Sequence, residues 1–186
     1  VGAMIAREFP GVPVSLSSEV VPELREYERG TTTTANAFVQ PLMDHYVARL
    51  EEALAERGFR GRFHLMQSSG GTASPEMARA FPIRLLESGP AGGGLVTAFF
   101  GARVGHPDVI SFDMGGTTAK ACLIQDGRPE VAPMMEAARV HRFKRGSGLP
   151  IKAPVIDMIE IGAGGGSIAR VDALGLLKVG PHSAGA

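Results

Sequence analysis

The stretch from residue 109 to residue 124 constrains the fold most, because it places a tight glycine turn between two short apolar segments. Residues 109–112 are mostly apolar and run into Asp113, and residues 121–124 resume the apolar pattern after Gly115 and Gly116. Short apolar segments with a glycine pair between them are typical of a β-hairpin. The sequence therefore predicts two antiparallel strands joined at the glycine pair.

The turn of this hairpin carries side chains that suit a metal-bound polyphosphate. The glycines can adopt positive φ and bring backbone N–H groups against an anion, which a Cβ atom would block. Hydroxyl groups add hydrogen-bond donors, an amine adds positive charge, and a carboxylate can hold a hydrated Mg²⁺. The candidate residues are Asp113 as metal ligand and catalytic residue, Lys120 as a second catalytic residue, and Gly115, Gly116, Thr117 and Thr118 as phosphate ligands.

A simpler interpretation of the same residues stays open. In an ordinary hairpin the glycines serve only the turn, and Asp113 and the threonines make local bonds to the backbone.

A second strand followed by glycines favours the phosphate-binding interpretation. The strand-like residues 154–161 run into a cluster that offers five further candidate ligands: Gly162, Gly164, Gly165, Gly166 and Ser167. The cluster fails the G-x-G-x-x-G dinucleotide pattern at its third position, and residues 168–179 alternate like another hairpin instead of opening a long helix. No G-x-x-x-x-G-K-[ST] phosphate loop occurs in the sequence. Two such turns predict one nucleotide held from two sides.

The amino-acid composition excludes some classes of function. The 186 residues are 44% hydrophobic, and 19 basic residues balance 19 acidic ones. This balance removes any general electrostatic case for nucleic acid or a membrane surface. The single cysteine, Cys122, lies in an apolar segment, which indicates a buried structural thiol and fits a reducing, cytoplasmic setting. The histidines lack metal-ligand spacing, and no serine lies in a G-x-S-x-G elbow.

The longest predicted helix begins near the four threonines at 31–34, which are candidate N-caps, and ends at Arg57 before Gly58. Apolar residues recur on it at every fourth position. This pattern predicts a face packed in the core, with docking of a partner as the alternative. The face consists of Phe38, Leu42, Tyr46, Leu50 and Leu54.

Shorter elements are expected on either side of this helix. Strands are predicted at 14–16, 62–66 and 83–86, and Ser74 and Pro75 predict the start of a short helix. The glycine-rich residues 87–93 precede an apolar helix at 95–104. They are expected either to bind an anion or to allow close packing. The basic residues 141–148 are expected to form a solvated loop, or to face an acidic substrate.

Taken together, these strings resemble the hydantoinase A and 5-oxoprolinase family over nearly the whole chain. The order and spacing of several short motifs carry the resemblance: residues 17–19, 26–29, 36–37, 66–71, 88–93, 112–117, 162–168, 179–181 and 183–186. The resemblance implies an α/β, mixed-sheet, ribonuclease H-like lobe of an actin-like ATPase with flanking helices. It also implies that the chain is a fragment, with a helix-rich segment at 1–105 and a β-rich segment at 106–186.

The same resemblance implies an activity. Members open a cyclic amide such as a hydantoin or 5-oxoproline with ATP and Mg²⁺, or in related branches carboxylate a ketone, and typically work with a B-type subunit. Asp113 to Lys120 would be the second phosphate motif, and Gly162 to Ser167 the turn at the adenosine. Many members have an Asp where this chain has Lys120, which puts a base near the phosphates. A non-catalytic nucleotide-binding or assembly module is the remaining alternative.

Overall fold

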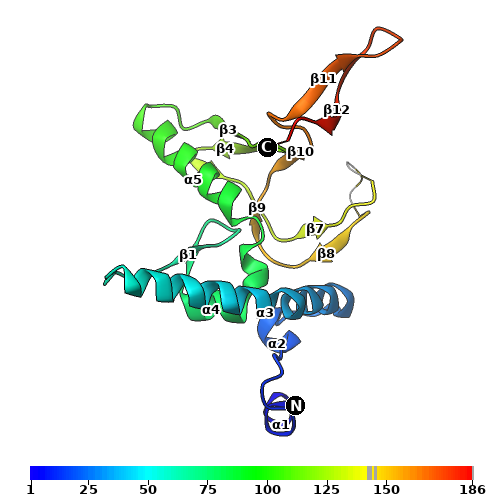
Figure 1. The fold of residues 1–186 in the computed structure, drawn as a ribbon. Coiled ribbons are helices and arrows are strands. Elements are labelled where there is room, and N and C mark those ends of the chain that lie inside the picture. Colours follow the sequence, from blue (N-terminus) through cyan, green and yellow to red (C-terminus); the bar gives the residue numbers. More distant parts are fainter. Residues whose placement is uncertain (142–143, 145, 186) are drawn as a thin grey trace. The chain divides into compact units, whose positions relative to one another are not determined.

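A computed structural model describes residues 1–141, 144 and 146–185 of the chain (Figure 1). These residues form two compact units, each built from two separate parts of the sequence. The first unit comprises residues 1–88 and 132–155, and the second comprises residues 89–131 and 156–186. Part of the basic connection at 141–148, namely residues 142, 143 and 145, lies outside the described residues. The predicted division into a helix-rich segment at 1–105 and a β-rich segment at 106–186 remains a prediction.

The first unit is built mainly from helices. In chain order these are α1 (Gly2–Glu8), α2 (Ser17–Val20), the long α3 (Glu26–Glu56), α4 (Pro75–Ala80) and a 3-10 helix, η1 (Pro82–Leu85). Two antiparallel strand pairs complete the unit: β1 (Leu65–Met66) with β2 (Thr72–Ala73), and β7 (Met135–Ala137) with β8 (Leu149–Ile151). Its buried apolar core consists of Val20, Val21, Ile83, Ile151 and Ala153.

The long helix ends where the sequence predicts but begins earlier. Arg57 is its C-cap, and Gly58 follows with φ of +75°. At the other end the helix already begins at Glu26, so the predicted N-cap role of the threonines is wrong. Their hydroxyls instead donate to carbonyl oxygens one turn back, as Thr32 does to Glu28 at 2.6 Å and Thr33 to Arg29 at 2.7 Å.

The predicted buried face of α3 is also wrong over most of its length. The side chains of Phe38, Leu42 and Tyr46 are 85%, 72% and 53% exposed, whereas Thr32, Asn36 and Val47 are buried. The reason lies in what packs on the helix: α2, α4, η1 and β8 all contact α3. These elements cover a face whose buried positions include polar side chains, which a search for apolar spacing does not detect.

The amide of Asn36 explains why a polar side chain is buried there. Its Nδ2 donates to Ser15 Oγ at 2.9 Å and to the carbonyl oxygen of Ala80 at 3.0 Å. Its Oδ1 accepts from the N–H of Ile83 at 3.3 Å. A buried amide with these partners has its hydrogen-bonding groups satisfied, and it links α3 to three other places in the first unit.

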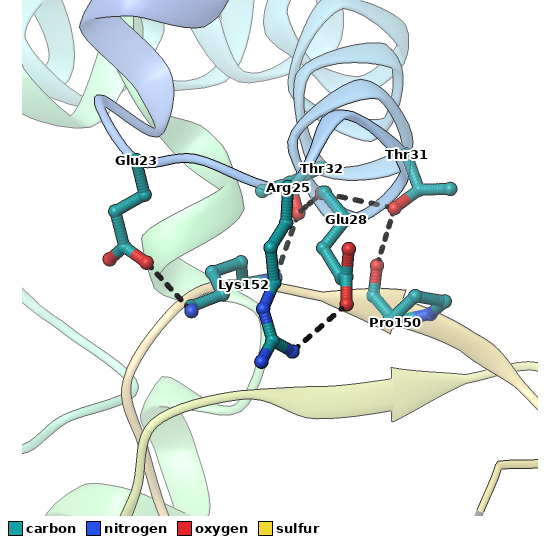
Figure 2. Close-up of polar contacts among 7 residues, drawn as sticks. All are labelled: Glu23, Arg25, Glu28, Thr31, Thr32, Pro150 and Lys152. Carbon is teal, nitrogen blue, oxygen red and sulfur yellow. Dashed lines mark hydrogen bonds and ion pairs between the residues drawn. The ribbon is translucent and has the colours of Figure 1, made fainter.

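Thr31 and Thr32 form hydrogen bonds that connect the start of α3 to the segment around β8 (Figure 2). Thr31 Oγ1 donates to the carbonyl oxygen of Pro150, and Thr32 Oγ1 accepts from the N–H of Lys152, both at 2.7 Å. The Lys152 ammonium also lies 2.6 Å from a carboxylate oxygen of Glu23. These bonds join residues about 120 positions apart in the sequence, so they hold the two sequence segments of the first unit together.

The second unit contains a small antiparallel sheet with α5 (Ser88–Arg103) against it. The strand order is β10 (Ile159–Ile161), β4 (Ala119–Gln125) and β3 (Val109–Met114), and β5 (Arg128–Pro129) also pairs with β4. The hairpin predicted at the glycine pair is therefore confirmed. The core consists of Ala91 and Ala98 from α5 with Cys122, Ile124 and Ile156.

Small residues let α5 lie close to its neighbours. A Cβ added at Gly94 would lie 3.0 Å from Cys122 Sγ, and one at Gly101 would lie 2.7 Å from the carbonyl oxygen of His106. The helix begins at Ser88, so the glycine-rich residues 88–93 form its first turns instead of a loop before it. Within the region itself, a Cβ added at Gly89 or Gly93 would meet nothing within 4 Å, so the close packing belongs to Gly94 and Gly101 further along the helix, and the choice between anion binding and close packing for residues 87–93 stays open.

A second hairpin follows the sheet, as expected from the alternation in residues 168–179. It pairs β11 (Ser167–Val171) with β12 (Leu177–Ser183).

Two further short strands, β6 (Val131–Ala132) and β9 (Val155–Ile156), pair with each other.

Of the remaining predictions from local sequence, the helix cap at Ser74 is confirmed and the predicted strands are wrong or shorter than expected. Ser74 caps α4 as predicted, since its Oγ accepts from the N–H of Met77 at 3.4 Å. The strand predicted at 83–86 is wrong, because Pro82 starts the 3-10 helix η1 there. Residues 14–16 form no strand, and the strand predicted at 62–66 is confined to Leu65–Met66. Among the described helices, none combines the length and the apolar character needed to cross a membrane.

Candidate functional site

The hairpin of β3 and β4 positions the predicted phosphate-binding residues. Asp113 lies in β3 and is exposed, and its partner directly across the ladder is Lys120 of β4. Between them, residues 115–118 form the turn, which the N–H of Gly115 closes by donating to the carbonyl oxygen of Thr118 at 2.9 Å. Strand pairing thus brings the predicted acid and base side by side, because directly opposed residues project from the same face of a sheet.

The row of charges continues onto the third strand. Glu160 of β10 is the ladder partner of Lys120, and its Oε1 lies 3.6 Å from Lys120 Nζ. Three residues of alternating charge therefore lie across β3, β4 and β10: Asp113, Lys120 and Glu160. Glu160 was missed as a site residue. The signal that points to it is a single carboxylate between two apolar residues, Ile159 and Ile161, in the strand that precedes the second glycine cluster.

The two glycine turns lie directly against each other. The N–H of Gly165 donates to the carbonyl oxygen of Gly115 at 2.9 Å, and the N–H of Gly166 donates to that of Gly116 at 2.8 Å. The structure thus brings together the two clusters that lie some fifty positions apart in the sequence.

The second turn is also fixed by bonds within itself and to the end of β12. Gly164 N–H donates to Ser167 Oγ at 3.0 Å, and Ser167 N–H donates to the carbonyl oxygen of Gly164 at 2.9 Å. The carbonyl oxygen of Gly166 accepts from the N–H of Ala184 at 2.7 Å and from Ser183 Oγ at 3.0 Å. Gly162 precedes these bonds and lies exposed at the end of β10.

Close backbone approach, and not positive φ, explains several of these glycines. A Cβ at Gly164 would lie 2.5 Å from the carbonyl oxygen of Gly115, and one at Gly166 would collide with the carbonyl of Gly185. Gly115 does not have the positive φ expected from the sequence. The first turn therefore forms without a left-handed backbone conformation at Gly115.

The hydrogen bonds show which donors of the two turns remain for an anion. The N–H groups of Gly115 and of residues 164–167 are all used within the protein. Among the described hydrogen bonds, none uses the N–H of Gly116 or Thr117, or the hydroxyl groups of Thr117 and Thr118. These groups are consecutive in a turn, and Thr117 is exposed. Consecutive free N–H and hydroxyl groups in a turn fit phosphate oxygens.

The site offers fewer side chains for binding a metal ion than for binding phosphate. The described residues contain no group of three or more His, Cys, Asp or Glu side chains placed to hold a metal ion. A single carboxylate at Asp113 still fits Mg²⁺, because this ion keeps several waters and commonly binds through one or two carboxylates together with substrate phosphates.

Cys122 has the structural role that the sequence predicts. Its side chain is buried in the core between α5 and the sheet. Burial raises the pKa of the thiol, and a hydrogen bond with Ser111 opposes this effect in part. A buried thiol with a raised pKa is a poor nucleophile at neutral pH.

A mixed helix and strand fold of this kind is shared with two solved structures. The chain is similar to the ATP-dependent caprolactamase from Pseudomonas jessenii, with a TM-score of 0.78 and 35% identity over 99% of this chain and 25% of that one. It is also similar to acetone carboxylase in a nucleotide-free structure, with a TM-score of 0.72 and 27% identity over 98% of this chain and 24% of that one. These similarities define the class of the fold.

The model of the Hydantoinase/oxoprolinase family matches residues 29–186, and the chain belongs to this family. Protein MJ0964 of Methanocaldococcus jannaschii is 46% identical over 94% of this chain and 26% of its own length. Caprolactamase subunit alpha of Pseudomonas jessenii is 35% identical over 99% of this chain and 25% of its own length. The 5-oxoprolinase of Saccharomyces cerevisiae is 33% identical over 98% of this chain and 13% of its own length. The chain thus spans about a quarter of the first two of these relatives.

Proposed function

We propose that this chain is part of the A subunit of an ATP-dependent cyclic amidohydrolase, and that it supplies one side of the nucleotide site within an actin-like lobe. One observation carries the proposal. The two glycine turns are hydrogen-bonded to each other at the end of the sheet, and in the described part of the chain the N–H groups of Gly116 and Thr117 and the hydroxyls of Thr117 and Thr118 have no hydrogen-bond partner. Phosphate groups are held by such turns, and the related caprolactamase is described as ATP-dependent.

The residues take distinct roles in this proposal. Gly116, Thr117 and Thr118 bind phosphate oxygens, and Asp113 holds Mg²⁺ through its exposed carboxylate. The second turn, from Gly162 to Ser167, holds the first turn in place through Gly165 and Gly166 and forms the wall against the adenosine. Lys120 adds positive charge beside Asp113, and Glu160 holds its ammonium group.

The substrate class follows from the chemistry of the relatives. Caprolactam and 5-oxoproline are both lactams, so the enzymes named for them share the opening of a cyclic amide. ATP would supply phosphoryl transfer to the amide oxygen, which makes the ring carbonyl carbon susceptible to water. The protein's contribution to such a transfer is mainly positioning and charge neutralisation, which matches the donors and charges of residues 113–120.

Ketone carboxylation is the second candidate function. The similarity to acetone carboxylase favours it, because that fold match covers 98% of the chain. Turnover of ATP that requires both bicarbonate and a ketone would select this function, and turnover with a lactam alone would select ring opening.

Two further parts of the proposal concern the setting of the enzyme. The relatives include a protein named as a subunit, caprolactamase subunit alpha, and we expect a B-type subunit as partner. A cytoplasmic location fits the single buried cysteine and the balanced charge.

ATP titration of the complete polypeptide with single substitutions tests the nucleotide site. Asp113→Asn is expected to weaken Mg-ATP binding by roughly tenfold or more, as expected for the loss of a charged ligand. Asp157→Asn is the matched control, since Asp157 is an exposed acid of the same unit that belongs to neither turn. Unchanged ATP affinity in both Asp113→Asn and Gly165→Val would refute the proposal. Retained ATPase activity in Asp113→Ala would favour a non-catalytic module instead.

A further inference from the structure

The first unit contains a cavity of about 360 Å³ at the end of α3, lined by the last turns of this helix, the segment that leads to β1 and the start of α4. Its apolar side chains include Leu54 of α3, Phe59 and Phe63 of the following segment, and Pro75 of α4. Sites for small molecules have volumes of this order and are mostly apolar, with a few polar groups that orient the ligand. The cavity shares no residue with the two glycine turns.

The way in which α3 ends fixes Phe59 at this cavity. Gly58 has a positive φ, and its N–H donates to the carbonyl oxygen of Ala55 at 2.9 Å. The N–H of Phe59 donates to the carbonyl oxygen of Leu54 at 3.0 Å. A left-handed glycine with bonds of this kind is a common end of a helix. Backbone bonds therefore hold Phe59 beside the last turn of α3, whatever its side chain does.

The ring of Phe59 is available to an apolar ligand. A Cβ added at Gly61 would lie 2.5 Å from Cζ of this ring, so the ring covers the glycine. The Phe59 side chain is nevertheless 47% exposed, while Phe63 on the same segment is half-buried. Aromatic side chains offer a large apolar contact area, and two of them lie on the wall of this cavity.

The charged groups of the wall indicate the sign of a ligand. Its acid, Glu51, forms an ion pair with Arg79 of α4, whose Nε also lies 3.5 Å from Asp44 outside the wall. Arg62 and His64 of the wall are exposed, and within the described residues neither forms a hydrogen bond or an ion pair. A guanidinium group without a partner can bind a carboxylate through two parallel hydrogen bonds. The group of the wall that remains to be matched is thus a cation.

We propose that this cavity binds a small monocarboxylic acid with an apolar body. Arg62 holds the carboxylate, and His64 adds a ring nitrogen beside it. The apolar body of the acid lies against Leu54, Phe59 and Phe63. The inference does not rest on the proposed function, because all of these residues belong to the first unit and none to the nucleotide site.

Three matched probes test the class of ligand. Hydrocinnamate carries a phenyl ring and a carboxylate, hydrocinnamide replaces the carboxylate with a neutral amide, and phenylpropylamine carries an ammonium group. Isothermal titration of the complete polypeptide without ATP is expected to show saturable binding of hydrocinnamate. The amide and the amine are each expected to bind at least roughly tenfold more weakly, because they lose the charged hydrogen bonds to Arg62.

Substitutions place the probe in the cavity. Arg62→Gln is expected to weaken hydrocinnamate binding at least roughly tenfold and to leave hydrocinnamide unchanged. Arg60→Gln is the matched control and is expected to bind as the wild type does, because Arg60 is an exposed arginine of the same segment that does not line the cavity. Phe59→Ala is expected to weaken the acid and the amide alike, since it removes the apolar contact that both share.

Several results would overturn the inference. These are the absence of saturable hydrocinnamate binding, equal affinities for the three probes, tighter binding of the amine, and equal affinities in Arg62→Gln and Arg60→Gln. Unchanged binding in Phe59→Ala would overturn it as well. Loss of hydrocinnamate binding in Asp113→Asn would place the acid at the nucleotide site instead of this cavity.

Discussion

The N–H of Gly165 donates to the carbonyl oxygen of Gly115 across 2.9 Å, and this bond joins the two glycine turns of the candidate site. The backbones at the two turns are therefore in contact, and the space for side chains between them is small. The effect of this contact on stability can be measured by adding a Cβ atom at different glycines of the second turn, because these glycines differ in the space around them.

Gly164→Ala is expected to destabilise the second unit by about 1–3 kcal/mol, the usual cost of forcing extra volume into a tightly packed site. The added Cβ would lie 2.5 Å from the carbonyl oxygen of Gly115. Gly165→Ala is the matched control, since its Cβ would lie 3.8 Å from the same oxygen. Urea unfolding of both variants checks the prediction, and equal midpoints would contradict it.

Thr32→Val is expected to cost about 1–3 kcal/mol, because it leaves the N–H of Lys152 without its acceptor in a buried place. Thr33→Val is the control, since its hydroxyl donates only to the carbonyl oxygen of Arg29 on the same helix. Thermal unfolding distinguishes them. A loss at Thr33 as large as that at Thr32 would show that the bond to Lys152 contributes nothing.

Lys120→Met is expected to weaken ATP binding by the complete polypeptide several-fold, because it removes a positive charge beside the phosphate turn. Loss of the ion pair with Glu160 should itself cost no more than about 1 kcal/mol of stability, since the Glu160 side chain is half exposed. Glu160→Gln keeps the lysine and serves as the comparison. Isothermal titration and urea unfolding separate the two effects, and unchanged affinity in Lys120→Met would remove Lys120 from the site.

Cys122 is expected to resist alkylation in the native chain and to react quickly in urea. Burial raises the pKa of its thiol, so the folded state holds the proton more strongly than the unfolded state. The stabilisation is present below the unfolded pKa, roughly 8.5, and is lost as the pH rises above it. Labelling rates with and without urea, and urea midpoints between pH 7 and pH 10 in wild type and Cys122→Ala, check both statements. Fast labelling of the folded chain would contradict them.

The 186-residue chain alone is expected to bind ATP far more weakly than the complete polypeptide. The family resemblance implies that the longer proteins carry a first phosphate turn near their N-terminus, ahead of the motif at Asp113 to Lys120, and this sequence does not contain it. A ligand held from two sides loses most of its affinity when one side is missing. Titration of the chain by itself checks this, and micromolar affinity would contradict it.

Local patterns predicted those parts of the fold that depend on neighbours in sequence. The glycine pair at 115–116 marked the hairpin, Gly58 marked the end of α3, and Ser74 with Pro75 marked the start of α4. Each signal acts within a turn or two of the backbone, so the sequence contains it directly.

The remaining features depend on distant partners. Which face of α3 is buried depends on α2, α4, η1 and β8, which pack against it, and Thr31 and Thr32 bind Pro150 and Lys152 about 120 positions away. In the candidate site, the partnership of Lys120 with Glu160 depends on the register of β10 against β4. Short apolar strands do not specify their register from sequence alone.

The amide of Asn36 makes three long-range hydrogen bonds. Its partners Ser15, Ala80 and Ile83 lie 21, 44 and 47 positions away in the sequence. Each of these bonds closes a long loop and so costs chain entropy, and displacing any one partner leaves a buried amide group of Asn36 without its hydrogen bond. Local opening around α3 is thereby coupled to η1 and to the segment at Ser15. These parts of the first unit should exchange their amide hydrogens as one cooperative unit, although α3 itself is held by local bonds.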